Sequence, residues 1–338
     1  MRNPPAPHLQ HAPSSIARRD FLRHSVVASL AASAFSFEEQ NLNARARDSS
    51  SAASPGSPAK IPMGKIGKVR ISRIICGGNL ISGYAHSRDL IYVSDLLKNY
   101  FTHQKIMETW ELCEEHGINT MIVYPNDKNA GEAYRKYGRD YGGSIQYLAQ
   151  IAPGEKDLKT EVLQARDMGA AGAFLVGNLG DQWTREGKTQ LIAELISLIK
   201  EQGMIAGVAG HELRTPKSVE QAGGNPDFYV KTLHSADYWS TRRPDQRQEV
   251  IDNYAVDNYW CMDPDETIQF MAKIQRPWIA YKVLAAGAIH PRQGFKFAFE
   301  NGADFAAVGM FDFQVAENAL VAREVLSKTV ERKRAWMA

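Results

Sequence analysis

The stretch TQLIAELISLIKEQGMIAGVAGH, residues 189–211, contains the clearest helix and strand signals in the sequence. Its apolar side chains recur at a spacing that places them on one face of a helix: Leu191, Ile192, Leu195, Ile196 and Ile199. Gly203 is the type of residue at which helices end, and the apolar run 204–209 after it is typical of a buried strand. The stretch therefore predicts an amphipathic helix that leads directly into a buried strand.

The same alternation continues through the chain after Gly64, and residues 108–116 and 263–275 have further helical patterns. Eight short apolar runs are the predicted strands: 71–76, 118–124, 145–151, 171–176, 204–209, 228–233, 278–284 and 305–308. Repeated strand–helix alternation predicts a parallel sheet of the α/β class, and eight units over about 275 residues suit a single closed (β/α)8 TIM barrel at 64–338. A doubly wound open sheet is the alternative, but no GxGxxG follows the first strand.

The first residues of the chain read as a targeting region. Arg18 and Arg19 precede Phe21 and Leu22, and a weakly apolar, Ala/Ser-rich run extends over 26–37. This arrangement resembles a twin-arginine signal peptide, which implies export of the folded protein by the twin-arginine translocase to the periplasm. We expect a signal region at 1–46, a disordered Ser/Pro/Ala-rich linker at 47–63, and a mature protein that starts between residues 35 and 64.

Composition excludes several classes of function. The 338 residues carry a formal net charge of +2 with no block of like charge, so no nucleic-acid partner is expected. No apolar segment is long enough for a stable membrane span. The three cysteines, Cys76, Cys113 and Cys261, include no CxxC pair, which argues against a disulfide framework or a zinc knuckle.

The first half of the chain resembles the aldo/keto reductases. The resemblance rests on GKVRISRIICGGNLISG, TWELCEEHGINTMIVYP and the 191–211 unit, which are similar to the family's opening hairpin, its second helix and strand, and a later helix–strand unit. The reductase catalytic residues are not matched. The positions of its Asp, Lys and His correspond to Ile122, Gln150 and Val176 or Gly177, and Pro125, Asn126 and Asp127 include no tyrosine. The resemblance therefore implies a barrel but not reductase activity.

The second half resembles another family over about twenty residues. DFYVKTLH and IAYKVLAAGAI are locally similar to the strands of deoxyribose-phosphate aldolase that carry its two lysines. The resemblance implies that Lys231 or Lys282 forms an imine with a carbonyl substrate. If Phe228 and Val230 face the helices, alternation directs Lys231 into the barrel, and the same reasoning directs Lys282 inward. Two close ammonium groups would favour a neutral, nucleophilic lysine.

Active sites of such barrels lie at the carboxyl-terminal ends of the strands. His211 and His234 follow neighbouring strands, so we expect them to act as general acid and base, or as ligands of a divalent metal if one is bound. Further polar residues at strand ends are candidates for substrate binding: Asn79, Tyr124, Gln150, Asn178 and Glu212. The long loop 235–263 is a candidate lid or site wall.

These observations favour an exported enzyme for a small polar, carbohydrate-like carbonyl compound. The expected chemistry is that of a lyase, aldolase or isomerase, with Lys231, Lys282, His211 and His234 as catalytic residues. An imine mechanism requires no cofactor. The enzymatic alternative is an NAD(P)-linked oxidoreductase with a rebuilt site, and the non-enzymatic alternative is a periplasmic binding or scaffold barrel.

Overall fold

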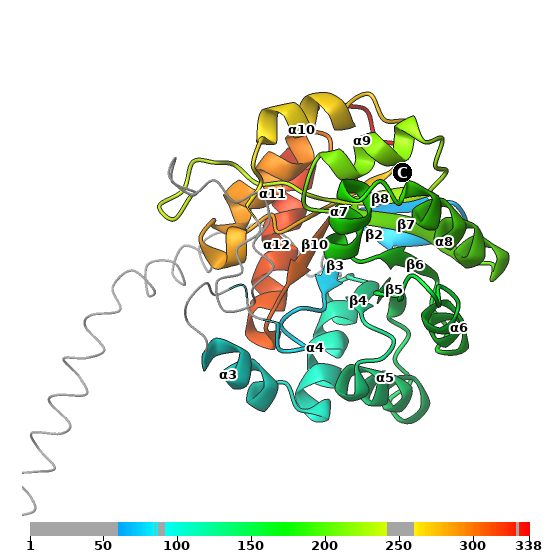
Figure 1. Ribbon diagram of the computed structural model, residues 1–338. Helices are drawn as coiled ribbons and strands as arrows, with labels where there is room; N and C mark the ends of the chain where they lie inside the picture. The colour runs from blue at the N-terminus through cyan, green and yellow to red at the C-terminus, as the bar shows by residue number, and fades with distance from the viewer. Residues whose placement is uncertain (1–59, 85, 87–91, 242–259, 329–330) are drawn as a thin grey trace, which may run out of the picture. The chain divides into compact units, whose positions relative to one another are not determined.

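The computed structural model describes residues 60–84, 86, 92–241, 260–328 and 331–338 (Figure 1). The described residues all belong to one compact unit, residues 59–338. The predicted signal region, most of the linker and most of the loop 235–263 lie outside the described residues. Ile61 is 1% exposed and packs in the core, so the folded unit begins before the expected boundary at residue 64.

Eight strands form a closed barrel, and each strand pairs in parallel with both of its neighbours. The ring order is β10-β3-β4-β5-β6-β7-β8-β9, which confirms the predicted (β/α)8 barrel. The strands are β3 (Ile74–Gly77), β4 (Thr120–Val123), β5 (Gln146–Ile151), β6 (Gly172–Leu175), β7 (Ile205–Gly210), β8 (Phe228–Thr232), β9 (Trp278–Tyr281) and β10 (Phe305–Gly309).

An antiparallel hairpin of β1 (Met63–Ile66) and β2 (Val69–Ser72) precedes the barrel. The predicted first strand, 71–76, is therefore two elements, the end of β2 and most of β3. Ile66, Val69 and Ile71 of the hairpin join the cluster of side chains that fills the barrel interior. Gly67 lies against the first residue of β7, so the hairpin closes the amino-terminal end of the barrel.

The interior becomes less crowded toward the carboxyl-terminal ends of the strands. Phe305 at the start of β10 is fully buried, whereas Ala307 and Gly309, the next residues on the same face, have small side chains or none. Gly309 is exposed at the end of the strand. We call this end of the barrel the mouth.

The helices surround the barrel, as Figure 1 shows. They are α3 (Tyr92–Tyr100), α4 (His103–Glu115), α5 (Lys128–Asp140), α6 (Thr160–Asp167), α7 (Gly177–Arg185), α8 (Thr189–Glu201), α9 (Arg214–Gln221), α10 (Pro264–Met271), α11 (Pro291–Glu300) and α12 (Asp312–Lys328), with a 3-10 turn at Ala285–Gly287. The helix expected from 189–203 is α8, and Gly203 follows it with a positive φ of 76°. No helix in the described ranges has the length and apolar character needed to cross a bilayer.

Candidate active site at the mouth of the barrel

His211 directly follows β7, and its ring is held by a buried aspartate. Nδ1 of His211 lies 2.8 Å from Oδ2 of Asp181 in α7, which is 0% exposed. The same carboxylate accepts the backbone N–H groups of His211 (2.9 Å) and Glu212 (3.0 Å) and the hydroxyl of Thr215 (2.7 Å). Because a carboxylate is an acceptor, Nδ1 of His211 donates to it, and the lone pair of the neutral imidazole is then on Nε2. This arrangement suits a general base.

Tyr281, the last residue of β9, lies beside His211. Their ring centroids are 5.3 Å apart, with an angle of 39° between the ring planes. A Cβ on Gly177, the first residue of α7, would lie 2.6 Å from His211 Cε1 and 2.6 Å from the Tyr281 hydroxyl oxygen. Glycine is therefore required at this position, where an imidazole and a phenol occupy the space of a side chain.

Lys282 connects this group to the opposite side of the mouth. Its Nζ lies 5.7 Å from the centre of the Tyr281 ring and 2.6 Å from Nε2 of His86, a residue after β3. The side-chain amide nitrogen of Asn79 lies 2.7 Å from the same His86 nitrogen. A chain of contacts thus runs from Asp181 through His211, Tyr281 and Lys282 to the loop after β3. His211, Lys282 and Asn79 were predicted from the sequence, whereas Asp181, Tyr281 and His86 were not.

Thr232 ends β8 in register with Tyr281. Its side chain is 0% exposed, and its hydroxyl oxygen has no hydrogen-bond partner among the described residues. Val230, two residues earlier, belongs to the interior cluster, so alternation places the Thr232 hydroxyl on the interior face as well. A buried polar atom in this position is suited to a water molecule or a substrate oxygen.

The expected direction of Lys231 is wrong. Phe228 and Val230 pack in the barrel interior and Tyr229 packs in the layer between the barrel and the helices, so Lys231 points to that outer layer. Its Nζ donates to the carbonyl oxygens of His211 (2.7 Å) and Thr232 (3.1 Å), and the residue is 2% exposed. Burial lowers the pKa of the Lys231 ammonium. The nearby Cys261 and Asp181 partly offset this by raising the pKa. Lys231 therefore holds the backbone at the His211 end of β7 and does not face the interior.

Both ring nitrogens of His234 have partners. Nδ1 donates to the carbonyl oxygen of Ser235 (2.9 Å), and Nε2 accepts the backbone N–H of Cys261 (2.9 Å). Burial lowers the pKa of His234 to about 4. The hydrogen bond to Ser235 raises this pKa in part, and the positive charges of Lys231 and Lys282 lower it further. A neutral ring with both nitrogens engaged links the end of β8 to residue 261, and this arrangement offers no lone pair to a metal or a substrate.

The other residues that were predicted to bind the substrate differ in whether they lie at the mouth. Gln150, near the end of β5, and Asn178, in the first turn of α7, are half-buried. Tyr124, after β4, packs edge-to-face on Tyr84 with ring centroids 5.8 Å apart. Glu212, which is 8% exposed, pairs instead with Arg185 at 3.0 Å, between α7 and α9. Within the described parts of the chain, no three His, Cys, Asp or Glu side chains are grouped closely enough to hold a metal ion.

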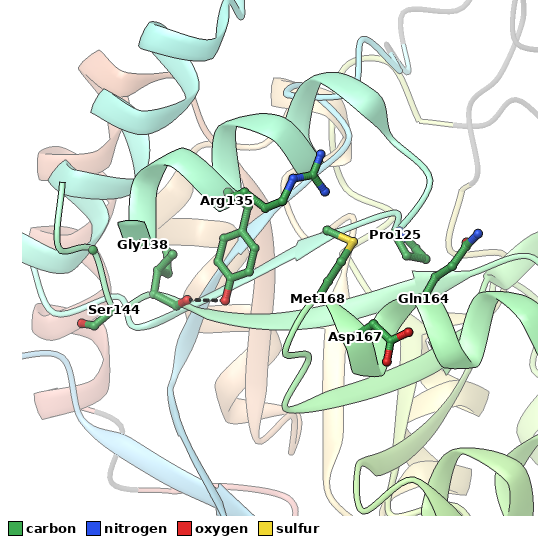
Figure 2. A pocket seen from close by; sticks show the side chains of 10 residues that line it. Pro125, Arg135, Gly138, Ser144, Gln164, Asp167 and Met168 are labelled. Atoms are coloured by element: carbon green, nitrogen blue, oxygen red, sulfur yellow. Dashed lines mark hydrogen bonds between the residues drawn. The ribbon is translucent and has the colours of Figure 1, made fainter. Parts of the chain in front are cut away.

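A groove of about 630 Å³ lies on the helical layer between α5 and α6 (Figure 2). Tyr134 and Met168 line it, with Arg135 and Asp167 among its charged residues. Apart from Pro125 it is formed by residues away from the carboxyl-terminal ends of the strands, and it contains none of the predicted site residues. We therefore place the candidate site at the mouth, where titratable groups converge.

Comparisons with known proteins support the fold. No protein-family model matches the sequence, and no curated protein matches it significantly. Among solved structures, a protein of Pseudomonas aeruginosa described as a provisional aldo-keto reductase is 15% identical, with a TM-score of 0.53 over 80% of this chain and 96% of that one. A second structure of the same description is 16% identical, with a TM-score of 0.51 over 78% and 94%. These structural neighbours share the eight-stranded barrel, and identities this low establish the fold alone.

Proposed function

We propose that the protein is an enzyme that transfers protons at the carbon next to the carbonyl group of a small polar substrate, as an isomerase or lyase does. The Asp181–His211 pair is the observation that carries the proposal. Nε2 of His211 takes the proton, and Asp181 stabilises the imidazolium that forms. The Tyr281 hydroxyl would then stabilise the negative charge that develops on the carbonyl oxygen, because the Tyr281 ring lies beside His211.

An imine mechanism is the alternative to proton transfer by His211, and it would use Lys282 in place of Lys231. Lys231 is buried against two carbonyl oxygens outside the barrel, whereas Lys282 is partly exposed at the mouth beside Tyr281. Borohydride added with a reactive carbonyl substrate should therefore fix an adduct on Lys282 if an imine forms, and mass spectrometry of peptides identifies the lysine. An adduct on Lys231 would contradict this assignment.

A reductase is the second candidate, and one observation favours it. The aldo/keto reductase resemblance places the family's histidine at Val176 or Gly177, and here the His211 ring and the Tyr281 hydroxyl adjoin Gly177. An imidazole, a phenol and the nearby Lys282 are groups that can donate a proton to a carbonyl oxygen. A nicotinamide cofactor would supply the hydride in such a reaction. Because Ile122 and Gln150 stand where the family has its Asp and Lys, we expect no reduction of simple aldehydes with NADPH.

A deuterium-exchange screen separates these functions. The folded chain is incubated in D2O with small hydroxy-aldehydes, hydroxy-ketones and 2-keto acids, and proton NMR follows loss of the signal next to the carbonyl group. The proposal predicts exchange without a nicotinamide. Oxidation of NADPH with no exchange would favour the reductase, and neither reaction on any compound would favour a binding or scaffold barrel.

We also propose that the protein is exported through the twin-arginine pathway, on the grounds of Arg18 and Arg19. Replacing both by lysine should retain the precursor in the cytoplasm, as cell fractionation would show. The amino terminus of the exported form should precede Lys60, because Ile61 is buried in the core. Export of the double variant at the normal level would contradict the proposal.

A further inference from the structure

The loop between β9 and α11 keeps an unfavourable backbone beside the candidate site. Lys282, Ala285 and Ala286 have φ angles of 60°, 45° and 56°. These angles lie in the left-handed region, which residues with a Cβ avoid and glycine adopts freely. Three such residues within five positions are unusual, and strained backbone of this kind is concentrated at functional sites.

The left-handed turn determines where the Lys282 side chain lies. Tyr281 packs against the interior cluster, so a regular continuation of β9 would direct Lys282 toward the helices, as β8 directs Lys231. The turn instead places Lys282 Nζ 2.6 Å from His86, in the loop after β3. Because β10 lies between β9 and β3, this contact joins two loops that follow strands on either side of β10.

Other features make this part of the mouth favourable for negative charge. The helix α7 begins at Gly177 beside the Tyr281 hydroxyl, and no side chain caps its first turn. The positive end of the α7 dipole and the Lys282 ammonium thus both lie near Tyr281. Two acidic residues near the strand ends are engaged elsewhere, Glu212 with Arg185 and Asp312 with Lys105.

We infer that the substrate carries an anionic oxygen group, a carboxylate or a phosphate monoester, which Lys282 binds. The strained loop positions the ammonium beside His86, so that the anion is held there while the carbonyl end of the substrate reaches Tyr281 and His211. Because it names the substrate class of that site, the inference rests on the proposed function. A lysine ammonium supplies a charge-assisted hydrogen bond to either anion.

Anion binding can be measured without turnover. Inorganic phosphate and glycolate, a small carboxylate, are titrated separately into the folded chain at low ionic strength, and NMR or calorimetry gives the dissociation constants. We expect one of the two to bind, and Lys282→Met to weaken that binding about 10-fold or more. Lys282→Arg should retain most of it. Ala286→Gly is the matched control, since it relieves strain at an exposed position of the same loop and keeps the ammonium.

The outcomes distinguish the source of the anion. Lys282-dependent binding of phosphate alone indicates a phosphate monoester substrate, and Lys282-dependent binding of glycolate alone indicates a carboxylate. Equal affinity of the wild type and Lys282→Met for both probes, or binding of neither, overturns the inference. If no compound exchanges deuterium but phosphate or glycolate binds through Lys282, the anion site stands and the proposed reaction fails.

Discussion

Gly177 carries no side chain because two functional groups occupy the space that its Cβ would fill. An added methyl group would displace the His211 ring or the Tyr281 hydroxyl, each of which would be 2.6 Å from the new carbon. Displacements of about 1 Å at a catalytic group reduce rates by about 100-fold. Gly177→Ala should therefore lower kcat by about 10- to 100-fold in the exchange assay and cost about 1–3 kcal/mol of stability through overpacking.

Gly138→Ala is the matched control for this substitution. Gly138 is also in a helix, α5, and a Cβ there would meet only a backbone oxygen 3.9 Å away. The control should keep full activity and gain up to about 1 kcal/mol of stability. Equal activity of the two variants would mean that the contacts at Gly177 have no part in the reaction.

His234 makes folding stability depend on pH. Its pKa is about 4 in the folded protein and near the ordinary value of 6.5 in the unfolded chain, so the unfolded chain binds the proton more tightly. The stability from the neutral ring is present above about pH 6.5 and is lost as the pH falls toward 4, by about 3 kcal/mol. Urea denaturation across this range should show a shallower pH dependence for His234→Gln. An unchanged slope would show that other groups cause the loss.

Residue-level prediction failed for Lys231 for a physical reason. Both faces of a barrel strand are buried, one in the interior and one against the helices, so apolar residues do not alternate with polar ones along β8. The sequence predicts that Phe228 faces the helices, but its side chain packs in the barrel interior. The sequence contains no signal that separates these two buried faces.

The segment 331–338 is the element that secures the amino-terminal end of the barrel. Arg334 pairs with Asp304 at 2.9 Å, and both side chains are at most 4% exposed. The Trp336 ring lies against two guanidinium groups. Its centroid is 3.9 Å from Cζ of Arg73 and 3.3 Å from Cζ of Arg332. Arg332 also donates to the carbonyl oxygen of Phe299 in the last turn of α11, so these arginines hold both the barrel and the end of a helix.

Asp304→Asn should destabilise the protein by about 3–5 kcal/mol, because Arg334 would remain buried without its charged partner. Asp140→Asn breaks an exposed pair with Arg139 and should cost less than about 1 kcal/mol. Adding Arg334→Met to Asp304→Asn should restore part of the loss. Urea denaturation measures all three, and a small cost for Asp304→Asn would show that the pair does not secure the segment.

At the scale of elements, local conformation limited what could be predicted. The helix α8 was predicted closely because its apolar spacing and Gly203 agree. The strand β9 ends at Tyr281, three residues before the predicted end at residue 284. It ends there because Lys282 adopts a left-handed conformation, which the sequence does not predict for a lysine. This deviation directs Lys282 toward the loop after β3.

For the molecule as a whole, eight repeated strand–helix units were enough to predict the barrel. The partners within the site were not predictable. Asp181 and His211 are 30 residues apart and belong to different elements, and the pairing of the neighbouring strands β6 and β7 brings them together. His86 and Lys282, 196 residues apart, meet because β10 joins β9 to β3 and closes the ring.

The central claim is that His211 transfers the proton, and a matched pair of histidine variants tests it most directly. On a compound that the wild type exchanges, His211→Asn should lower the rate of deuterium exchange by about 100-fold or more. His234→Gln should exchange at close to the wild-type rate under conditions where circular dichroism shows both variants folded. Exchange by folded His211→Asn at the wild-type rate, or its loss only in His234→Gln, would contradict the account.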